Sequence, residues 1–264
     1  MRIVNKVYNI NDSINKTIVL ISDIHYYDKT DIKHLHKLLN RIKKINPDYI
    51  CIPGDITDYA YIDNEELLID WFKELSTICK VIISIGNHEF QISRTKKLYG
   101  FNKELNKKLK SINNVYVLDN DNVVIDNINF IGLTLPFEHY YYNKESLESF
   151  NKYLRVKNNS KNYSILLCHS PFNVCNKEIV NKLNVDLILC GHTHGGIIPR
   201  FLRCIIKNSG LISPNKKLFP KNVYGSIKID NTNIIITSGI SVLPKKFGIL
   251  RHLLSSEVAI IKIK

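Results

Sequence analysis

Two histidines, His192 and His194, stand two residues apart in the sequence Gly-His-Thr-His, directly after the apolar run 185–190. A short apolar run that ends at glycine is typical of a buried strand followed by a sharp turn. In extended chain, residues two apart point to the same side, so we expect both imidazoles to lean over one point in space. Two convergent imidazoles indicate a metal site. Taken alone, the pair could also be two histidines in an ordinary polar loop.

Four other apolar runs end in polar residues that could act beside this pair. The complete set at the five run ends is Asp23, His25, Asp55, Asp58, Asn87, His88, His169, His192 and His194. Five of the nine histidines fall in these short stretches, which chance placement would not produce. Any one of these residues could be a turn or helix-cap residue. Together, and in this order, they predict one shared polar site.

The chemistry of these side chains favours transition metals. Carboxylate, amide and imidazole donors, with no thiolate among them, suit Mn, Fe, Zn or Co better than Ca or a structural Zn. The donors are too many for one ion. We therefore predict two divalent transition-metal ions per chain, Mn being the first choice, about 3.5 to 4 Å apart and bridged by one carboxylate and a solvent oxygen. Such a pair leaves an opening of the size of a phosphate group.

Strands that end at one edge of a sheet must position these residues. The apolar runs predict strands over 17–22, 49–53, 81–85, 164–168 and 185–190, and helical spacing predicts helices over 31–45, 64–77, 98–112, 146–156 and 173–183. Asp31 is expected to cap the first of these helices. Shorter strands are expected over 115–118, 123–125, 128–133, 223–229, 233–237 and 257–263. In open α/β sheets ligands bind at the carboxyl ends of the strands, so the polar clusters should meet there.

The composition is that of a folded, soluble protein. The 264 residues, 44% hydrophobic and 23% charged, contain no linker that would divide them, so we expect one domain over 1–264. The apolar runs are of strand length and the N-terminus lacks a signal-peptide core, which predicts a cytoplasmic protein. The six cysteines are scattered singly and are expected to be reduced, with Cys51, Cys168 and Cys190 in the core.

The net charge of +13 is compatible with three kinds of polyanion: nucleic acid, an anionic membrane or a phosphorylated substrate. The lysines are spread over nearly every predicted helix and loop instead of being gathered in one arm. The sequence has no aromatic-rich basic face or added nucleic-acid module, so no specific nucleic acid partner is predicted. No protein partner is predicted either.

The motifs of this chain, in their residues and in their order, resemble those of the calcineurin-like metallophosphoesterases. Asp-x-His at 23–25, Gly-Asp-x-x-Asp at 54–58, Gly-Asn-His-Glu at 86–89, a lone histidine at 169 and Gly-His-Thr-His at 191–194 follow one another between Ile18 and Gly195. The resemblance implies an α/β fold, the calcineurin-like αββα sandwich of two mixed β-sheets flanked by helices. The run 191–197, with the late Ser-Gly-Ile at 238–240, is similar to the bacterial phosphodiesterase branch that includes the YkuE and YaeI types.

The resemblance also implies a role for each residue. The metal ligands would form two sets that share one carboxylate: Asp23, His25 and His194 for the first metal, Asn87, His169 and His192 for the second, and Asp55 for both. His88 would be the general acid, oriented by Asp58, while a metal-bridged hydroxide acts as the nucleophile. This predicts a phosphoester hydrolase that prefers diesters to monoesters. The remaining histidines are expected at the surface: His34, His36, His139 and His252.

Two features of the chain bear on the substrate, a phosphoester small molecule or a lipid-linked phosphoester. Tyr59 follows Asp58 where protein Ser/Thr phosphatases place a phosphate-gripping arginine, which argues against that activity; Arg94 or a lysine could serve instead. The segment 197–221 mixes basic and apolar residues next to the histidine pair, as a peripheral membrane contact would. A lipid-linked phosphodiester or pyrophosphate would then be an attractive substrate. The alternative is an ordinary loop that covers the sheet.

Two other functions fit the same residues. A nuclease acting on nucleic acid phosphodiesters is favoured by the charge. A non-catalytic metal-binding scaffold of the same fold would predict a gap among the site residues, notably at His88, and the sequence shows none.

Overall fold

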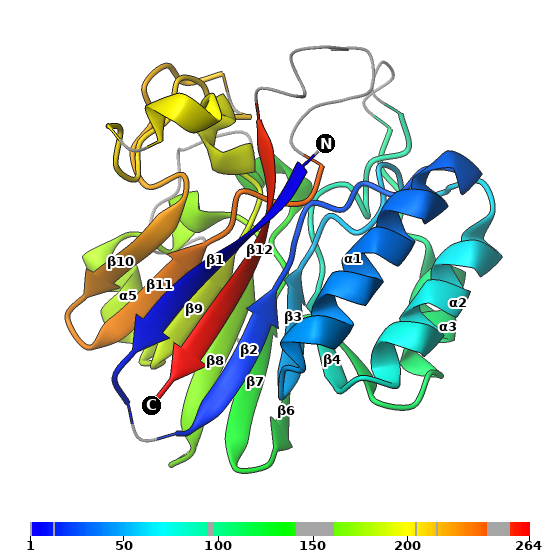
Figure 1. The fold of residues 1–264 in the computed structure, drawn as a ribbon, viewed down its shortest axis with the longest axis horizontal. Coiled ribbons are helices and arrows are strands. Elements are labelled where there is room, and N and C mark those ends of the chain that lie inside the picture. The colour runs from blue at the N-terminus through cyan, green and yellow to red at the C-terminus, as the bar shows by residue number, and fades with distance from the viewer. Residues whose placement is uncertain are drawn as a thin grey trace.

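The computed structural model describes residues 2–12, 14–93, 98–140, 161–203, 205–214, 216–241 and 254–264. Two mixed β-sheets of six strands each lie face to face, with helices on their outer faces (Figure 1). The αββα sandwich that the sequence predicted is therefore confirmed. One domain over 1–264 stays a prediction.

The first sheet has the strand order β1-β12-β2-β3-β4-β5. Its strands are β1 (Arg2–Ile10), β12 (Ser255–Ile263), β2 (Lys16–Leu20), β3 (Tyr49–Pro53), β4 (Lys80–Ser84) and β5 (Val115–Leu118). Neighbouring strands run parallel, except that β12 and β2 are antiparallel. The carboxyl ends of β2, β3 and β4 consequently lie at one edge of the sheet.

The second sheet has the strand order β10-β11-β9-β8-β7-β6. Its strands are β10 (Gly225–Ile229), β11 (Thr232–Ile236), β9 (Leu187–Cys190), β8 (Tyr163–Cys168), β7 (Ile128–Leu133) and β6 (Asp121–Ile125). The four central strands are parallel, and the edge strands β10 and β6 are antiparallel to their neighbours.

The central strands are largely apolar because both of their faces are covered. Every residue of β3, β7, β8 and β9 is buried. Side chains on the inner faces, such as Leu20 and Leu167, pack together between the two sheets. Side chains on the outer faces, such as Val19 and Ile188, pack against helices. Continuous apolar runs are what strands buried on both faces require.

The helices lie on the outer faces of both sheets. The α-helices of the described ranges are α1 (Ile32–Ile45), α2 (Glu65–Ser76) and α3 (Lys103–Lys110) on the first sheet and α5 (Lys177–Leu183) on the second. Short 3₁₀ turns are η1 (Lys29–Asp31), η2 (Phe137–Tyr140), η3 (Pro171–Asn173), η4 (His194–Ile197) and η5 (Arg200–Leu202). Trp71 of α2 donates from Nε1 to the carbonyl of Leu35 in α1 at 3.0 Å, which joins the two helices. None of the described helices has the length and apolar character that crossing a bilayer requires.

Two predicted helices are shorter than the sequence suggested. The helix predicted over 98–112 is α3, which begins at Lys103 because Asn102 accepts the backbone N–H of Leu105 at 3.0 Å. The helix predicted over 173–183 is α5, where Asn176 caps the N-terminus in the same way. Asp31 precedes α1 but makes no capping bond, because its carboxylate accepts backbone N–H groups of the preceding loop. The helix predicted over 146–156 lies outside the described residues.

Strand β1 was not predicted. It is an edge strand that pairs along its whole length with β12, 253 residues away in the sequence. One of its faces is open to solvent, so exposed polar residues such as Asn5 and Asn9 interrupt the apolar pattern. The partner strand, not the local sequence, holds this segment in place.

The prediction for the core cysteines is confirmed. Cys51 packs between the sheets, and Cys168 and Cys190 pack beneath α5. All three are buried and free, and Cys79 and Cys175 are free as well. These thiols therefore act as small apolar side chains.

Candidate metal centre

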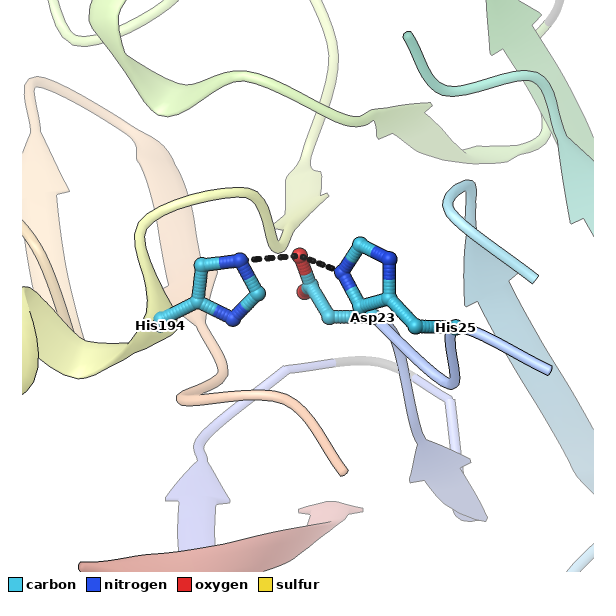
Figure 2. Close-up of side chains that lie close together, drawn as sticks. All are labelled: Asp23, His25 and His194. Carbon is cyan, nitrogen blue, oxygen red and sulfur yellow. Dashed lines mark ion pairs between the residues drawn. The ribbon is translucent and has the colours of Figure 1, made fainter. Parts of the chain in front are cut away.

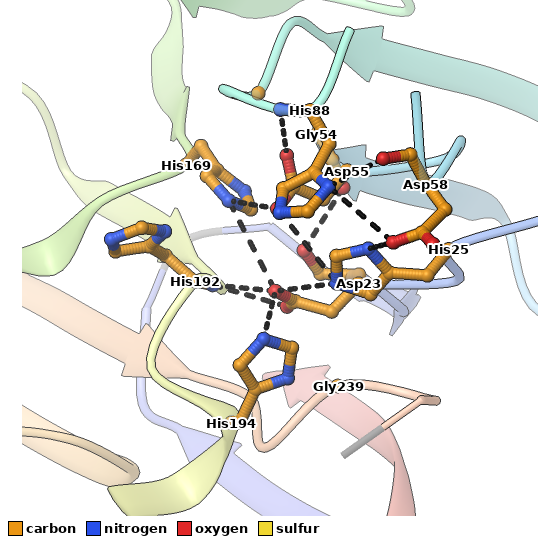
Figure 3. A network of polar contacts seen from close by, with 12 residues as sticks. Asp23, His25, Gly54, Asp55, Asp58, His88, His169, His192, His194 and Gly239 are labelled. Carbon is orange, nitrogen blue, oxygen red and sulfur yellow. Dashed lines mark hydrogen bonds and ion pairs between the residues drawn. The ribbon is translucent and has the colours of Figure 1, made fainter. Parts of the chain in front are cut away.

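Loops that follow five strands bring the predicted site residues to the edge where the two sheets meet (Figure 3). The contributions along the chain are Asp23 and His25 after β2, Asp55 and Asp58 after β3, Asn87 and His88 after β4, His169 after β8, and His192 and His194 after β9. The sequence therefore predicted correctly that polar residues from both sheets share one edge.

Asp23, His25 and His194 form a first group of possible metal ligands, with one ligand atom of each within 4.8 Å of the others. Both imidazoles face the carboxylate of Asp23 (Figure 2). The Nε2 atoms of His25 and His194 lie 3.9 and 3.8 Å from Asp23 Oδ1. These distances are too long for hydrogen bonds, so the three side chains face one another but make no hydrogen bond with each other.

Asp55, His169 and His192 form a second group of this kind. His169 Nε2 lies 3.0 Å from Asp55 Oδ2, and the rings of His169 and His192 meet edge to face with centroids 5.0 Å apart. Asp55 also belongs to a third group, with His25 and His88. One carboxylate thus reaches both sides of the cluster, as a bridging ligand must.

His88 lies beside both groups with its Nε2 atom 4.0 Å from Asp55 Oδ2. Its Nδ1 atom is 2.7 Å from the backbone carbonyl oxygen of Asp58 and 3.5 Å from Asp58 Oδ1. The same carboxylate oxygen is also 3.5 Å from His25 Nδ1. Asp58 therefore contacts His88 most closely through its carbonyl group, and its carboxylate is shared between two histidines.

The extended geometry predicted for the histidine pair is wrong. The φ angles of His192 and His194 are 68° and 48°, in the left-handed region. Their imidazoles therefore turn to different partners, and each joins a different ligand group. The φ angles of Asp23, His25 and Asp55 are 52°, 49° and 51°. Such backbone conformations cost free energy in L-residues, and they cluster at functional sites.

Two glycines allow the backbone to approach the carboxylates closely. A Cβ atom on Gly191 would lie 2.6 Å from Asp23 Oδ2, and one on Gly86 would overlap Asp55 Oδ1. The close approach lets backbone N–H groups hold both carboxylates. The N–H of His192 donates to both oxygens of Asp23, at 3.1 and 3.0 Å, and that of His88 donates to Asp55 Oδ1 at 2.9 Å.

Burial keeps three of the imidazoles neutral. It lowers the pKa of His25, of His192 and of His194, in the last case to about 4. Neighbouring histidines lower these pKa values further. Burial also lowers the pKa of His169, but the adjacent Asp55 outweighs it and raises this pKa to about 9. Neutral imidazole is the form that binds a metal ion, so three of the four are ready for coordination.

The two buried carboxylates differ in their surroundings. Burial raises the pKa of Asp23, and this effect exceeds the opposing attraction of His169. Burial would also raise the pKa of Asp55, but His169 and His88 together lower it well below its ordinary value. Cations placed among these side chains would stabilise the charged form of both carboxylates.

The residues of the centre fit bound metal ions. The buried Nε2 atoms of His25 and His192 have no hydrogen-bond partner. Buried polar atoms without partners are rare in proteins unless they bind a ligand or water. By contrast, Nδ1 of His169 lies 2.6 Å from the carbonyl oxygen of Pro53, which fixes the ring and directs Nε2 toward Asp55. A backbone contact of this kind is typical of histidines that bind metals.

Glu89, to which the sequence assigned no role, joins the loops after β3 and β4. Its Oε2 atom accepts the backbone N–H groups of Asp55 and Gly86, at 3.0 and 2.8 Å. Its Oε1 atom accepts those of Ile56 and Thr57, at 2.7 and 3.1 Å. The buried carboxylate thereby holds the turn that presents Asp55. Its place in the Gly-Asn-His-Glu motif was the only signal in the sequence.

We expect Glu89→Gln to lower the free energy of unfolding by about 2 to 4 kcal/mol, because the amide nitrogen cannot accept the two N–H groups that it would face. Urea denaturation followed by circular dichroism measures the change. Glu74→Gln, at an exposed position of α2, is the control and should leave the midpoint unchanged. Equal midpoints for Glu89→Gln and the wild type would contradict the structural role of Glu89.

Tyr140 is a second residue that the sequence did not single out. It is buried, and its ring centroid lies 5.8 Å from that of His169 and 5.5 Å from that of His192. Its ring thus lies beside both imidazoles of the second group. No local pattern marked it, because its role depends on contacts with residues far away in the chain.

The remaining predicted positions lie outside the cluster or outside the described residues. His36 is exposed on α1 as predicted, whereas His34 and His139 are only partly exposed. His252 and Arg94 are not among the described residues. Tyr59 contacts Tyr27 ring to ring, with centroids 5.7 Å apart.

The profile of the calcineurin-like phosphoesterase family matches residues 16–196, which contain every candidate ligand. The chain belongs to the calcineurin-like phosphoesterase family. Among the curated members, an uncharacterized metallophosphoesterase of Campylobacter jejuni is 26% identical over 197 residues, covering 74% of this chain and 48% of that protein. This member of the family thus spans about half the length of that relative.

Two further proteins are similar to this phosphoesterase family member. The UDP-2,3-diacylglucosamine pyrophosphatase LpxG of Chlamydia trachomatis is 23% identical over 242 residues, covering 75% of this chain and 70% of that protein. A solved structure of a dimetal phosphatase from Danio rerio has a TM-score of 0.48 and 15% identity, covering 88% of this chain and 90% of that one.

Proposed function

We propose that this protein hydrolyses phosphoesters with two divalent transition-metal ions, and that it prefers diesters to monoesters. The observation that carries the proposal is the pair of ligand groups at one sheet edge, with Asp55 close to the histidines of both. Mn is our first choice of metal, and Fe, Zn or Co would suit the same donors. Membership of the bacterial branch that includes the YkuE and YaeI types is part of the proposal.

The two groups support the carboxylate and imidazole members of the ligand sets proposed from the sequence. Asp23, His25 and His194 would hold one ion, and Asn87, His169 and His192 the other, with Asp55 contacting both. Ions bound there would supply a nucleophilic water near neutral pH and offset the negative charge of the phosphate. The buried neutral imidazoles and the N–H groups that donate to Asp23 and Asp55 keep the ligand atoms in place.

We assign to His88 the role of protonating the leaving oxygen. Its Nδ1 is engaged by the carbonyl of Asp58, so Nε2 is the atom that faces the centre. The side chain is 16% exposed, in contrast to the fully buried His169, so a substrate can reach it. A general acid must lie within reach of the leaving group, and among the accessible histidines His88 is the one that we propose as a neighbour of the ligands and not as a ligand. A non-catalytic scaffold would be expected to lack a site residue at position 88, and this chain has His88 there.

A lipid-linked phosphodiester or pyrophosphate is the substrate class that we favour. The relative from Chlamydia trachomatis is named as a pyrophosphatase of a diacylated nucleotide sugar, and it aligns with most of this chain. A small phosphoester is the alternative within the same chemistry.

Metal analysis and a substrate panel test the proposal. After reconstitution with Mn we expect close to two ions per chain, and metal-dependent hydrolysis of at least one phosphodiester. The panel contains mononucleotides, cyclic nucleotides, glycerophosphodiesters, nucleotide-sugar lipids and, for the nuclease alternative, single- and double-stranded DNA. One ion or none per chain would contradict the dinuclear site, and absence of all turnover with bound metal would contradict the enzyme.

A further inference from the structure

The exposed large apolar residues gather at the same edge as the candidate metal centre. Of the eleven found among the described residues, nine lie in loops that follow strands at this edge. Those nine are Tyr27, Tyr61, Ile92, Leu98, Tyr99, Phe201, Ile205, Leu218 and Phe219. The other two, Val7 and Val124, lie on edge strands of the sheets. Exposed apolar residues concentrated on one part of a surface mark an interaction site.

Four of the nine belong to the segment 197–221, which we call the basic lobe. Phe201, Ile205, Leu218 and Phe219 are between 65% and 75% exposed. Figure 1 shows the lobe in yellow to orange beyond the carboxyl end of β9. It begins three residues after His194, so its position is tied to that of the candidate ligand.

The basic lobe already has a small core of its own. The members of this core and its partly buried neighbours are Ile198, Val223, Tyr224, Phe172, Leu202, Ile206 and Leu211. The apolar residues that the lobe needs for folding therefore point inward. Ile205 lies beside the inward Ile206 yet is 75% exposed, so folding of the lobe does not account for it.

Contacts with the rest of the protein hold the basic lobe in place. Arg203 Nη1 lies 3.6 Å from the buried carboxylate of Glu257 in β12. The guanidinium group of Arg203 also lies over the ring of Tyr224, 5.1 Å from its centroid. Thr193, beside His194, donates from Oγ1 to the carbonyl of Val223 at 2.5 Å. The exposed apolar residues are thus presented from a fixed base next to the metal centre.

The charge of the basic lobe indicates what it contacts. Residues 197–221 contain no Asp or Glu and six cationic residues: Arg200, Arg203, Lys207, Lys216, Lys217 and Lys221. Lys216 and Lys217 are exposed directly beside Leu218 and Phe219, and Lys207 is exposed two residues after Ile205. Protein interfaces are depleted in lysine at their centre. Apolar side chains interleaved with lysine are instead typical of surfaces that bind the headgroup region of anionic membranes.

We propose that the basic lobe docks on anionic lipid bilayers, with Phe201, Ile205, Leu218 and Phe219 inserted among the headgroups. The edge that carries the metal centre then faces the membrane, and the loops after β2, β3 and β4 carry further exposed apolar side chains. In this orientation a phosphoester carried by a lipid reaches the centre from the bilayer. The orientation of the substrate rests on the proposed function, whereas the docking itself does not.

Cosedimentation with vesicles tests the docking. The metal-loaded protein should bind vesicles of phosphatidylcholine mixed with phosphatidylglycerol, should bind phosphatidylcholine alone much more weakly, and should be released by salt. We expect Phe201→Ser with Phe219→Ser to weaken binding at least about 10-fold, since each change removes one inserted ring. Lys216→Glu with Lys217→Glu should weaken it by about 10-fold or more, on the anionic vesicles only.

The matched control is Val7→Thr with Val124→Thr, which removes two exposed apolar residues from edge strands outside the lobe. It should bind as the wild type does, and thermal unfolding should show that all variants fold. Absence of wild-type binding, or equal binding by the phenylalanine variant, would overturn the proposal. Self-association of the wild type that is lost in the phenylalanine variant would also overturn the proposal, because the exposed apolar residues would then contact a second copy of the chain.

The two proposals fail in different ways. Vesicle binding without any phosphoester hydrolysis would support the docking surface and contradict the proposed function. Hydrolysis of phosphodiesters without vesicle binding would support the proposed function and contradict the docking surface.

Discussion

His88→Asn is expected to lower kcat for an alkyl phosphodiester by about 100- to 10,000-fold, the contribution of a positioned general acid. The loss should be much smaller for an activated aryl ester, whose leaving group departs without a proton. Bound metal should stay close to the wild-type amount, because His88 is proposed as a neighbour of the ligands. Steady-state kinetics on the two ester classes, together with metal analysis, measures the difference.

His36→Ala is the control for this variant, since His36 is exposed on α1 away from the centre. It should match the wild type on both esters. An equal loss on alkyl and aryl esters in His88→Asn would argue against proton donation. Loss of one metal ion would instead identify His88 as a ligand. The test includes this outcome because His88 forms a group of possible ligands with His25 and Asp55.

Asp55→Asn is expected to remove at least one ion per chain and to lower turnover by more than about 100-fold, beyond the effect of losing an outer-shell partner. Asp55 is the carboxylate common to two groups of possible ligands, so its charge acts on both sides of the centre. Asparagine keeps the size of the side chain and the acceptor for the N–H of His88. The change therefore tests the charge and the coordination, and not the packing.

Asp70→Asn, at an exposed position of α2, is the control for Asp55→Asn. Metal content by elemental analysis and turnover with added Mn should both match the wild type in the control. Two ions per chain and normal turnover in Asp55→Asn would show that Asp55 is not a shared ligand and would require a different assignment of the centre.

The types of the site residues and the elements that carry them could be predicted from the sequence because both are local properties. A strand buried on both faces must be a short apolar run, and β3 has the predicted bounds of 49–53. A turn that holds a carboxylate against the backbone needs glycine, as Gly86 and Gly191 show. Since parallel strands end at one edge of a sheet, polar residues after several such runs had to come close together.

The orientation of the side chains was decided only by the tertiary structure. Extended chain was the simplest assumption for His192 and His194, and the left-handed backbone at both residues shows that it was wrong. His169 is oriented by a carbonyl 116 residues away in the sequence, and Asp55 is held by Glu89 through hydrogen bonds between two loops. Patterns within one segment carry no information about such contacts.

The sequence by itself determined which donors the protein has, their order and the αββα sandwich that gathers them. The tertiary structure decided that the histidine pair divides between two ligand groups, that β1 joins the sheet through β12, and that the apolar residues of 197–221 divide between an inner core and an exposed surface. The physical reason is the distance along the chain over which each kind of interaction acts. Periodicity and turn chemistry act between neighbours in the chain, whereas burial and coordination depend on residues that only folding brings together.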